Sequence, residues 1–328
     1  MRPDSIAVVV PLYQKAPHID RLMRSIWSQS RAADEVIIID DASTDGGPEA
    51  LAAFACPALT LLRREEPGPG GYAARNLGIT TAQSEWIVFL DADDAWRPEA
   101  LAEMARLIGL ADAGISCLFT RYERDYGGRI QPSPALGSAA TTGPVRLDLA
   151  GFVAAWLSSG QSPMWTSAVA ARRSALIAVG LFPAGKCNRG GDKDTWLRLL
   201  TVGDALASNL VTATYHRDAV NMVTRTTGAD QRPYLCTTLE ALLPGLAPKT
   251  AWAVKRLINL ELYSHAREAW RQRLRVPRDL VRGYRPLLDP FGYCVVLALV
   301  RAPAPLLEIS YRLRKAVVGA GHGRGEAA

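Results

Sequence analysis

The sequence has few cysteines, and their spacing pairs none of them. Five are scattered over 328 residues without a CxxC pair. This excludes the cysteine framework of a small disulfide-rich domain and the ligand spacing of a structural zinc site. We therefore expect a protein of a reducing compartment, the cytoplasm.

Long apolar runs and common phosphate-binding fingerprints are also missing. Phe291–Val300 is an uninterrupted apolar run of 10 residues, against the ~20 that a membrane-spanning helix needs. Ile6–Val10 is too short for the apolar core of a signal peptide, so we expect none. Gly68–Gly71 does not match GxGxxG, and neither GxxxxGKS nor GxxxxGKT occurs, which excludes a P-loop.

Charge is unevenly distributed along the chain. Residues 1–225 have 22 Lys and Arg against 24 Asp and Glu, whereas residues 226–328 have 16 against 8. We therefore expect an N-terminal domain, 1–225, and a basic, mostly helical region, 226–328. A basic segment suits an anionic surface, although a solvated helical face explains it equally well.

The sequence of the C-terminal region is compatible with several binding partners. Predicted helices there cover 235–243, 251–273 and 277–282. Leu306–Val318 alternates apolar and basic residues, which suits an interfacial helix on the inner face of a membrane. The same pattern suits a helix that covers the first domain or contacts a second subunit. Nucleic acid is not expected as a partner, since interleaved aromatics and a known binding motif are absent.

The first domain begins with an alternation of short β-branched runs and amphipathic stretches. The predicted strands are Ile6–Val10, Glu35–Ile39, Leu59–Leu62 and Trp86–Leu90. The predicted helices between them are His18–Gln29, Pro48–Ala55 and Tyr72–Thr80. This order predicts right-handed β-α-β units and a mostly parallel sheet with flanking helices, an α/β fold.

The middle of the chain is less regular. Tyr126–Pro144 is rich in Gly, Pro and Ser and predicts a long loop. After it we expect a helix at 152–158, a strand at Trp165–Ala170, and helices at 173–179 and 192–202.

Three acids follow the fourth predicted strand. Asp91, Asp93 and Asp94 lie within four residues and repel one another. A divalent cation such as Mg²⁺ or Mn²⁺ removes that repulsion and prefers hard oxygen ligands. The local alternative is an acidic turn in which Asp94 caps a helix that starts near residue 97.

Other strand ends have similar features. Asp40 and Asp41 follow the second strand, where a carboxylate can accept hydrogen bonds from a base or a ribose. The alternative is a turn formed by residues 43–45. Because ligands gather at the carboxyl ends of parallel strands, these residues, those of Pro11–Tyr13 and the acids from Asp91 on predict one site.

Two further motifs follow. Gly70 and Gly71 permit close backbone approach, and Arg75, on the helix after them, could reach a phosphate. Asp192 and Asp194 begin a later helix, where a carboxylate could serve as a general base for an acceptor hydroxyl. Ordinary helix capping is the alternative there.

Taken together, these motifs resemble those of the family 2 glycosyltransferases over about residues 5–225. The motifs are Val10-Pro11-Leu12-Tyr13, Ile39-Asp40-Asp41 with Ser43 and Asp45, Ala74-Arg75-Asn76 with Gly78, Leu90-Asp91 with Asp93 and Asp94, and Asp192 with Asp194, Trp196 and Arg198. The resemblance implies a GT-A fold, an inverting mechanism and a nucleotide-diphospho-sugar donor, foremost a UDP-sugar, bound with Mg²⁺ or Mn²⁺. It also implies a glycan or lipid-linked acceptor in cell-envelope or polysaccharide synthesis.

The resemblance also implies roles for individual residues. Asp192 would be the catalytic base, and Asp93 would bind the metal with help from Asp91 and Asp218. The residues that would line the nucleoside site are Pro11, Tyr13, Asp40, Asp41 and Arg75, with Asp91 near the ribose.

Two departures from the family pattern stand out. Gly191 replaces the Glu that usually precedes the base, and Asp218 stands where many relatives have His. Whether Asp218 or His216 would contact the metal is open.

Two other kinds of protein share the predicted sheet architecture. A sugar nucleotidyltransferase would favour a Gly-rich loop with Arg and Lys after the first strand, which is absent. A non-catalytic carbohydrate- or nucleotide-binding protein with the same fold would not need the retained acids.

Overall fold

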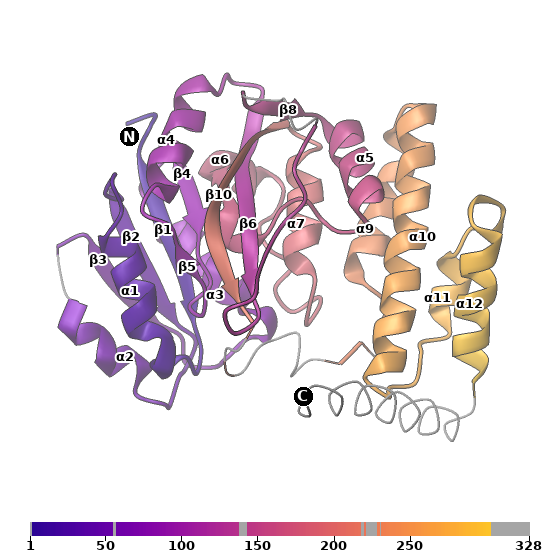
Figure 1. The fold of residues 1–328 in the computed structure, drawn as a ribbon, viewed down its shortest axis with the longest axis horizontal. Coiled ribbons are helices and arrows are strands. Elements are labelled where there is room, and N and C mark those ends of the chain that lie inside the picture. The colour runs from indigo at the N-terminus through magenta and orange to yellow at the C-terminus, as the bar shows by residue number, and fades with distance from the viewer. Residues whose placement is uncertain are drawn as a thin grey trace, which may run out of the picture. The chain divides into compact units, whose positions relative to one another are not determined.

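The computed structural model describes residues 2–54, 57–137, 143–217, 220, 228–229 and 231–302 (Figure 1). The chain divides into two compact units, Met1–Thr226 and Thr227–Ala328. The first is built on a β-sheet and the second is helical. This confirms the predicted fold class, an α/β domain followed by a helical extension.

One sheet contains ten strands of the described residues, eight of them in the order β3-β2-β1-β4-β9-β6-β10-β5. The strands are β1 (Ile6–Leu12), β2 (Glu35–Asp40), β3 (Leu59–Arg63), β4 (Trp86–Phe89), β5 (Ala95–Trp96), β6 (Ile115–Asp125), β7 (Ile130–Pro132), β8 (Val145–Leu147), β9 (Val169–Arg172) and β10 (Asp204–His216). The small strands β7 and β8 pair with β6 and β10.

The sheet is parallel among its first four strands, as the sequence predicted. β1 lies between β2 and β4, β2 pairs with β3, and all three pairings are parallel. Further along, β9 is antiparallel to both β4 and β6, whereas β10 is parallel to β6. The complete sheet is therefore mixed, and the four N-terminal strands end at the same edge.

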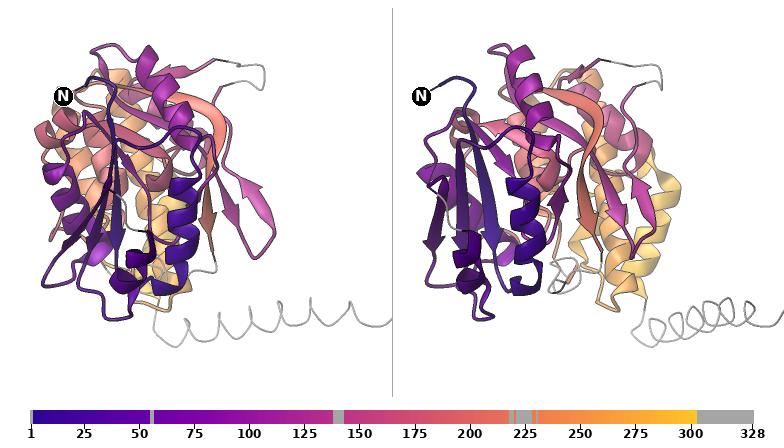
Figure 2. Two further views of the ribbon diagram at one scale, coloured as in Figure 1. Left: turned by 90° about the vertical axis from the view of Figure 1, so that its left-hand side faces the viewer. Right: turned by 60° about the vertical axis from the view of Figure 1, so that its left-hand side comes forward.

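Helices flank both faces of this sheet (Figure 2). Among the described residues of the first unit they are α1 (Ile19–Trp27), α2 (Gly47–Ala50), α3 (Tyr72–Thr81), α4 (Ala100–Leu110), α5 (Leu149–Ser159), α6 (Arg173–Ala178) and α7 (Gly191–Leu199). Side chains of α1 and α4 share a buried cluster with Val8 and Val10 of β1. Val9, between them in β1, faces the opposite side of the sheet. On that side it packs against α3, since a Cβ on Gly78 of α3 would come within 2.6 Å of Val9. Only glycine lets α3 pack so closely there.

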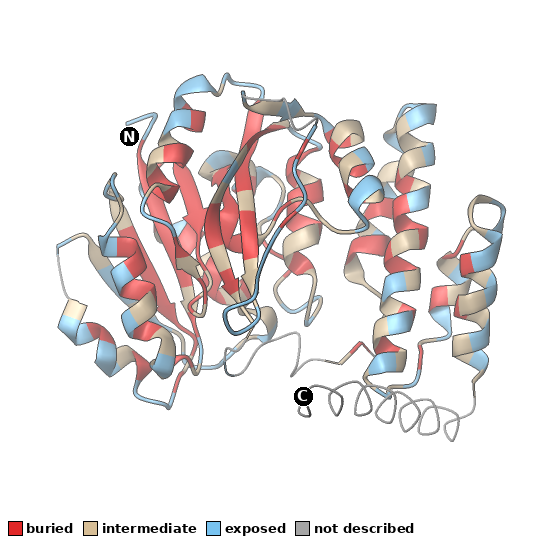
Figure 3. Ribbon diagram, in the orientation of Figure 1, coloured by how far each residue is buried: buried red, intermediate tan, exposed pale blue. Residues whose placement is uncertain are grey.

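In the second unit, the described residues form the helices α9 (Tyr234–Leu242), α10 (Pro248–Arg271), α11 (Asp279–Gly283) and α12 (Pro290–Arg301). The burial pattern along α10 shows one buried and one exposed side (Figure 3). Within the described ranges, none of the helices combines the length and apolar character required to cross a bilayer. The stretch Leu306–Val318 lies outside the described residues.

Some local predictions were wrong. The stretch expected to be a strand from Trp165 is a 3₁₀ turn, η4 (Thr166–Ala168), and β9 begins only at Val169. Asp94 does not cap α4, which starts at Ala100 after Glu99. The long strands β6 and β10 were missed altogether.

Candidate active site at the carboxyl ends of the strands

Asp91 lies in the turn after β4 and forms an ion pair with Arg75 of α3. The Arg75 guanidinium is buried, donates to the Gly70 carbonyl at 2.8 Å and lies 5.5 Å from the centre of the Phe182 ring. Burial raises the pKa of Asp91, Arg75 opposes that rise, and the negative charges of Asp93 and Asp192 add to it. Two predicted site residues, separated by 16 positions, are thus in direct contact.

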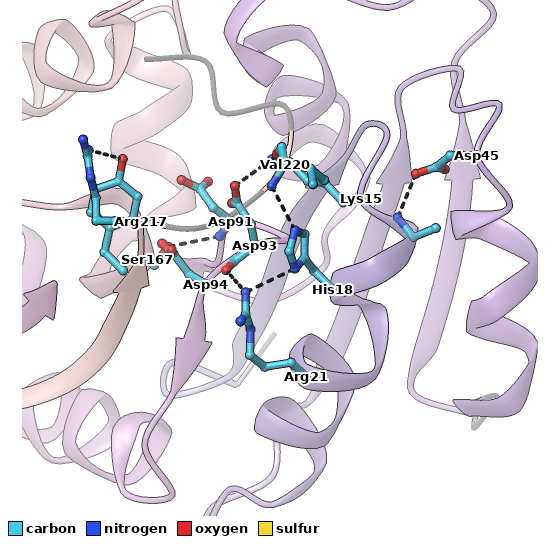
Figure 4. A network of polar contacts seen from close by, with 12 residues as sticks. Lys15, His18, Arg21, Asp45, Asp91, Asp93, Asp94, Ser167, Arg217 and Val220 are labelled. Carbon is cyan, nitrogen blue, oxygen red and sulfur yellow. Dashed lines mark hydrogen bonds and ion pairs between the residues drawn. The ribbon is translucent and has the colours of Figure 1, made fainter. Parts of the chain in front are cut away.

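Asp93 is paired with a cation that the sequence did not indicate. Lys15 Nζ lies 2.7 Å from Asp93 Oδ2, and both side chains are mostly buried. Arg21 donates to the main-chain carbonyl of Asp93 at 2.7 Å and contacts His18 Nδ1 at 3.3 Å (Figure 4). Lys15 also donates to the carbonyl of Val220. The turn after β4 is therefore tied to the loop after β1.

Asp94 is buried beneath the same turn. Its Oδ2 accepts hydrogen bonds from Trp165 Nε1 at 2.9 Å and Ser167 Oγ at 2.5 Å. Its Oδ1 is buried without a hydrogen-bond partner in the described structure. Burial, with the charges of Asp93 and Asp91, raises the pKa of Asp94 well above its ordinary value. These contacts tie the Asp94 carboxyl to Trp165 and Ser167 beneath the turn.

Asp192 lies in the first turn of α7 and is connected to this group of acids through η4. Thr166 Oγ1 donates to Asp192 Oδ2 at 3.4 Å, and Ser167 Oγ accepts from the Asp91 amide at 3.1 Å. The 3₁₀ turn η4 thus connects the predicted base to the acids after β4. The charge of Asp192 also raises the pKa of Asp91, after larger contributions from burial and Asp93.

Tyr72 supports the start of α7. Its hydroxyl accepts a hydrogen bond from the Gly191 amide at 2.8 Å, and its ring stacks on Phe182 at 6.1 Å. Burial raises the pKa of Tyr72, and the charge of Asp192 raises it further. A Cβ at position 191 would lie 2.8 Å from Tyr72 Cζ and 2.7 Å from Pro183 Cγ. The space beside the predicted base is therefore filled by Tyr72.

The predicted nucleoside residues lie at the same sheet edge. Pro11 and Arg75 both lie close to Gly71, because a Cβ there would lie 3.2 Å from Pro11 and 3.4 Å from the Arg75 guanidinium. Tyr13 is 43% exposed and open to a ligand. The site role of these residues stays a prediction.

Asp40 and Asp41 are buried at the end of β2. Asp40 accepts from the Ser43 amide at 2.9 Å, and its other oxygen lies 3.4 Å from Arg63. Asp41 accepts from the Gly68 amide at 3.0 Å and pairs with Arg64. Both carboxylates shape loops, and their contact with a nucleoside stays a prediction.

Several residues of the site were not predicted, chiefly Lys15, Tyr72, Thr166 and Ser167. Among them, only Lys15, close behind Pro11–Tyr13, carries a charge that could have drawn attention.

The residues after β4 suit a divalent cation in part. Asp91 and Asp93 offer hard carboxylate oxygens, and the neighbouring Asp94 has a buried Oδ1 without a hydrogen-bond partner in the described structure. The described residues contain no group of three or more His, Cys, Asp or Glu side chains arranged for a metal. Asp218 lies outside the described residues, and His216 lies 3.4 Å from Asp125. Two carboxylates fit a cation whose other ligands come from phosphates and water.

Comparisons with known proteins match part of this chain to one family. Residues 7–157 match the family model described as Glycosyl transferase family 2. The chain is 38% identical over 112 residues to the succinoglycan biosynthesis protein ExoO of Rhizobium meliloti. The aligned segment covers 34% of this chain and 32% of that protein. It is 30% identical over 112 residues to the glycosyltransferase GlyG of Streptococcus pneumoniae, covering 34% and 37%. The chain thus spans about a third of the length of these curated relatives.

Among solved structures, TarS residues 1–349 of S. aureus in complex with UDP-GlcNAc is similar in fold. The TM-score is 0.66 at 16% identity, and the match covers 94% of this chain and 92% of that one. At this identity the similarity establishes the fold.

Proposed function

We propose that this chain, whose residues 7–157 match the model of glycosyl transferase family 2, transfers a sugar from a nucleotide-diphospho-sugar to an acceptor hydroxyl. One observation supports the proposal: two consecutive residues of η4 connect Asp192 with the acids after β4, since Thr166 donates to Asp192 and Ser167 accepts from the Asp91 amide. A base on one element, held close to a leaving-group site on another, suits a single displacement.

In this mechanism Asp192 accepts the proton of the acceptor hydroxyl as it attacks the anomeric carbon. Attack from the face opposite the leaving diphosphate inverts the configuration of the sugar. The Tyr72–Gly191 and Thr166–Asp192 hydrogen bonds hold the base in place. When bound at Asp93 and Asp91, Mg²⁺ or Mn²⁺ would neutralise the charge of the departing diphosphate.

The nucleoside of the donor would lie beside Pro11, Tyr13 and Arg75. Arg75 is already paired with Asp91, so both side chains would be held ready for the donor. We propose that Asp41 and Asp40 support the loops that line the nucleoside site of the donor. Asp218 stays a proposed metal ligand.

The donor and the acceptor are suggested by the proteins that this chain resembles. TarS was solved with UDP-GlcNAc, and ExoO is named for succinoglycan biosynthesis. We therefore propose a UDP-sugar donor and a glycan or lipid-linked acceptor in polysaccharide or cell-envelope synthesis. The basic region 226–328 would bring a cytoplasmic enzyme to the inner face of the membrane.

A panel of nucleotide-sugars tests the proposal. Each is incubated with the full chain, with Mn²⁺ or with EDTA, and release of the nucleoside diphosphate and thermal stabilisation are both measured. We expect one UDP-sugar to be hydrolysed slowly, with Mn²⁺, and to raise the Tm. Stabilisation without turnover of any donor, even with glycan acceptors added, would instead indicate a non-catalytic binding protein.

A further inference from the structure

Lys15 forms an ion pair with Asp93, the acid that we propose as a metal ligand. Its ammonium lies 2.7 Å from Asp93 Oδ2, and the two side chains are only 11% and 14% exposed. A pair this well shielded from water interacts more strongly than one on the surface. Lys15 therefore neutralises Asp93 in the protein without ligands, much as Arg75 neutralises Asp91.

Contacts with the loop after β2 hold the backbone on both sides of Lys15 in place. Gln14 has a positive φ of 52°, which is uncommon for a residue other than glycine. Its side-chain amide donates to Thr44 Oγ1 at 3.0 Å and accepts from the Thr44 amide at 3.1 Å. The next residue after Lys15, Ala16, donates its amide to Asp45 Oδ2 at 2.8 Å. These contacts lock the loop after β1 onto the loop after β2, so that Lys15 projects toward the turn after β4 (Figure 4).

The same arrangement places Lys15 in competition with a metal. A cation on Asp93 Oδ2 and the ammonium of Lys15 cannot both contact that oxygen at full strength. A phosphate oxygen on the cation would lie within ~4 Å of Asp93, because each metal–oxygen bond is ~2.1 Å long for Mg²⁺. A lysine side chain has several rotatable bonds and crosses such a distance easily.

We infer that Lys15 is a diphosphate-binding residue that leaves Asp93 when a divalent cation binds there and transfers its ammonium to the diphosphate of the donor. This inference rests on the proposed function, because it needs a donor with a diphosphate. It places one positive charge beside the leaving group in addition to that of the divalent cation. It also explains how the buried Asp93 carboxylate is stabilised before ligands arrive.

Two binding measurements on the full chain test the inference. UDP and uridine, which differ only in the diphosphate, are titrated by calorimetry in the presence of Mn²⁺. Mn²⁺ alone is titrated by electron paramagnetic resonance. The variants are Lys15→Met, which keeps the length of the side chain, and Lys15→Arg, which keeps the charge. The matched control is Arg24→Met, which removes an exposed cation of α1 that pairs with Asp20.

We expect Lys15→Met to weaken UDP binding about 10- to 100-fold, the range for losing a hydrogen bond between charged groups. Uridine binding should not change, Mn²⁺ alone should bind several-fold more tightly, and Lys15→Arg should recover much of the UDP affinity. Arg24→Met should behave as the wild type. If Lys15→Met fails to fold, Lys15→Gln replaces it in the same measurements.

The outcomes separate this inference from the proposed function. If the wild type binds UDP more tightly than uridine and Lys15→Met retains that difference, the inference is wrong and the proposed donor site stands. If Mn²⁺ binds equally well to both proteins, Lys15 and the metal do not compete, and the inference is again wrong. If the wild type binds UDP no better than uridine, both the donor proposal and the inference fail.

Discussion

Replacement of Gly191 by alanine tests how the start of α7 is held beside the site. The new methyl group would lie 2.7 Å from Pro183 Cγ and 2.8 Å from Tyr72 Cζ. Carbon atoms pack best at ~3.5–4.0 Å, so the neighbours would have to move by about 1 Å. The Tyr72–Gly191 hydrogen bond of 2.8 Å would lengthen with them.

This overlap has two measurable consequences. Overpacking of this kind costs about 1–3 kcal/mol in the free energy of unfolding. Asp192 follows Gly191 directly, and a displacement of ~1 Å in a reacting group can lower a rate about 100-fold. We therefore expect Gly191→Ala to be destabilised and to hydrolyse the donor about 100-fold more slowly.

Urea unfolding and the rate of Mn²⁺-dependent donor hydrolysis are the assays. Gly109→Ala is the matched control, because Gly109 lies in α4 with nothing within 4 Å of a new Cβ. That control should gain about 0.5–1 kcal/mol, since alanine favours the helix, and keep its activity. A Gly191→Ala protein with the stability and rate of the wild type would refute the packing argument.

Three other substitutions separate the roles of the acids. Asp192→Asn should lower the transfer rate ~10²–10⁴-fold, as expected for loss of a general base, with donor affinity unchanged in calorimetry; normal turnover would remove Asp192 from this role. Asp93→Ala should abolish the effect of Mn²⁺ on nucleotide binding, and an affinity that still responds to Mn²⁺ would contradict the assignment. Asp94 has a pKa well above its ordinary value because it is buried near Asp93 and Asp91, so the folded chain holds a proton that the unfolded chain releases near pH ~3.9. Stability should therefore fall as the pH rises from there toward the pKa of the folded state, and Asp94→Asn should flatten this decline in urea midpoints; an unchanged slope would show that Asp94 is ionised.

The first half of the sheet could be predicted because its strands are short, apolar and β-branched. β1, β2, β3 and β4 lie within a few residues of their expected positions. Their ends also marked the site, since parallel strands bring their carboxyl ends to one edge.

The strands β6 and β10 have no such pattern. β6 carries Arg121 and Arg124 among its apolar residues, and β10 shifts register between Ala207 and Val211, which breaks the alternation of buried and exposed positions. A strand that bulges and bears charges is hard to recognise from periodicity alone.

Pairings between distant residues were equally hidden. Lys15 and Asp93 are 78 positions apart, and Tyr72 and Gly191 are 119 apart. The sequence placed Asp93 at a strand end and Asp192 on a helix, but only the fold reveals which side chain neutralises one and supports the other. Asp94 was misread for the same reason, because its partners Trp165 and Ser167 lie more than 70 positions downstream.

The stereochemistry of donor cleavage tests the central claim most directly. Time-resolved ¹H NMR can identify the anomer first released when the chain and Mn²⁺ hydrolyse an α-linked UDP-sugar such as UDP-GlcNAc or another donor from the panel. Single displacement assisted by Asp192 predicts the β-anomer first, with Asp192→Asn losing this activity. First release of the α-anomer, or the same rate from Asp192→Asn, would contradict the account.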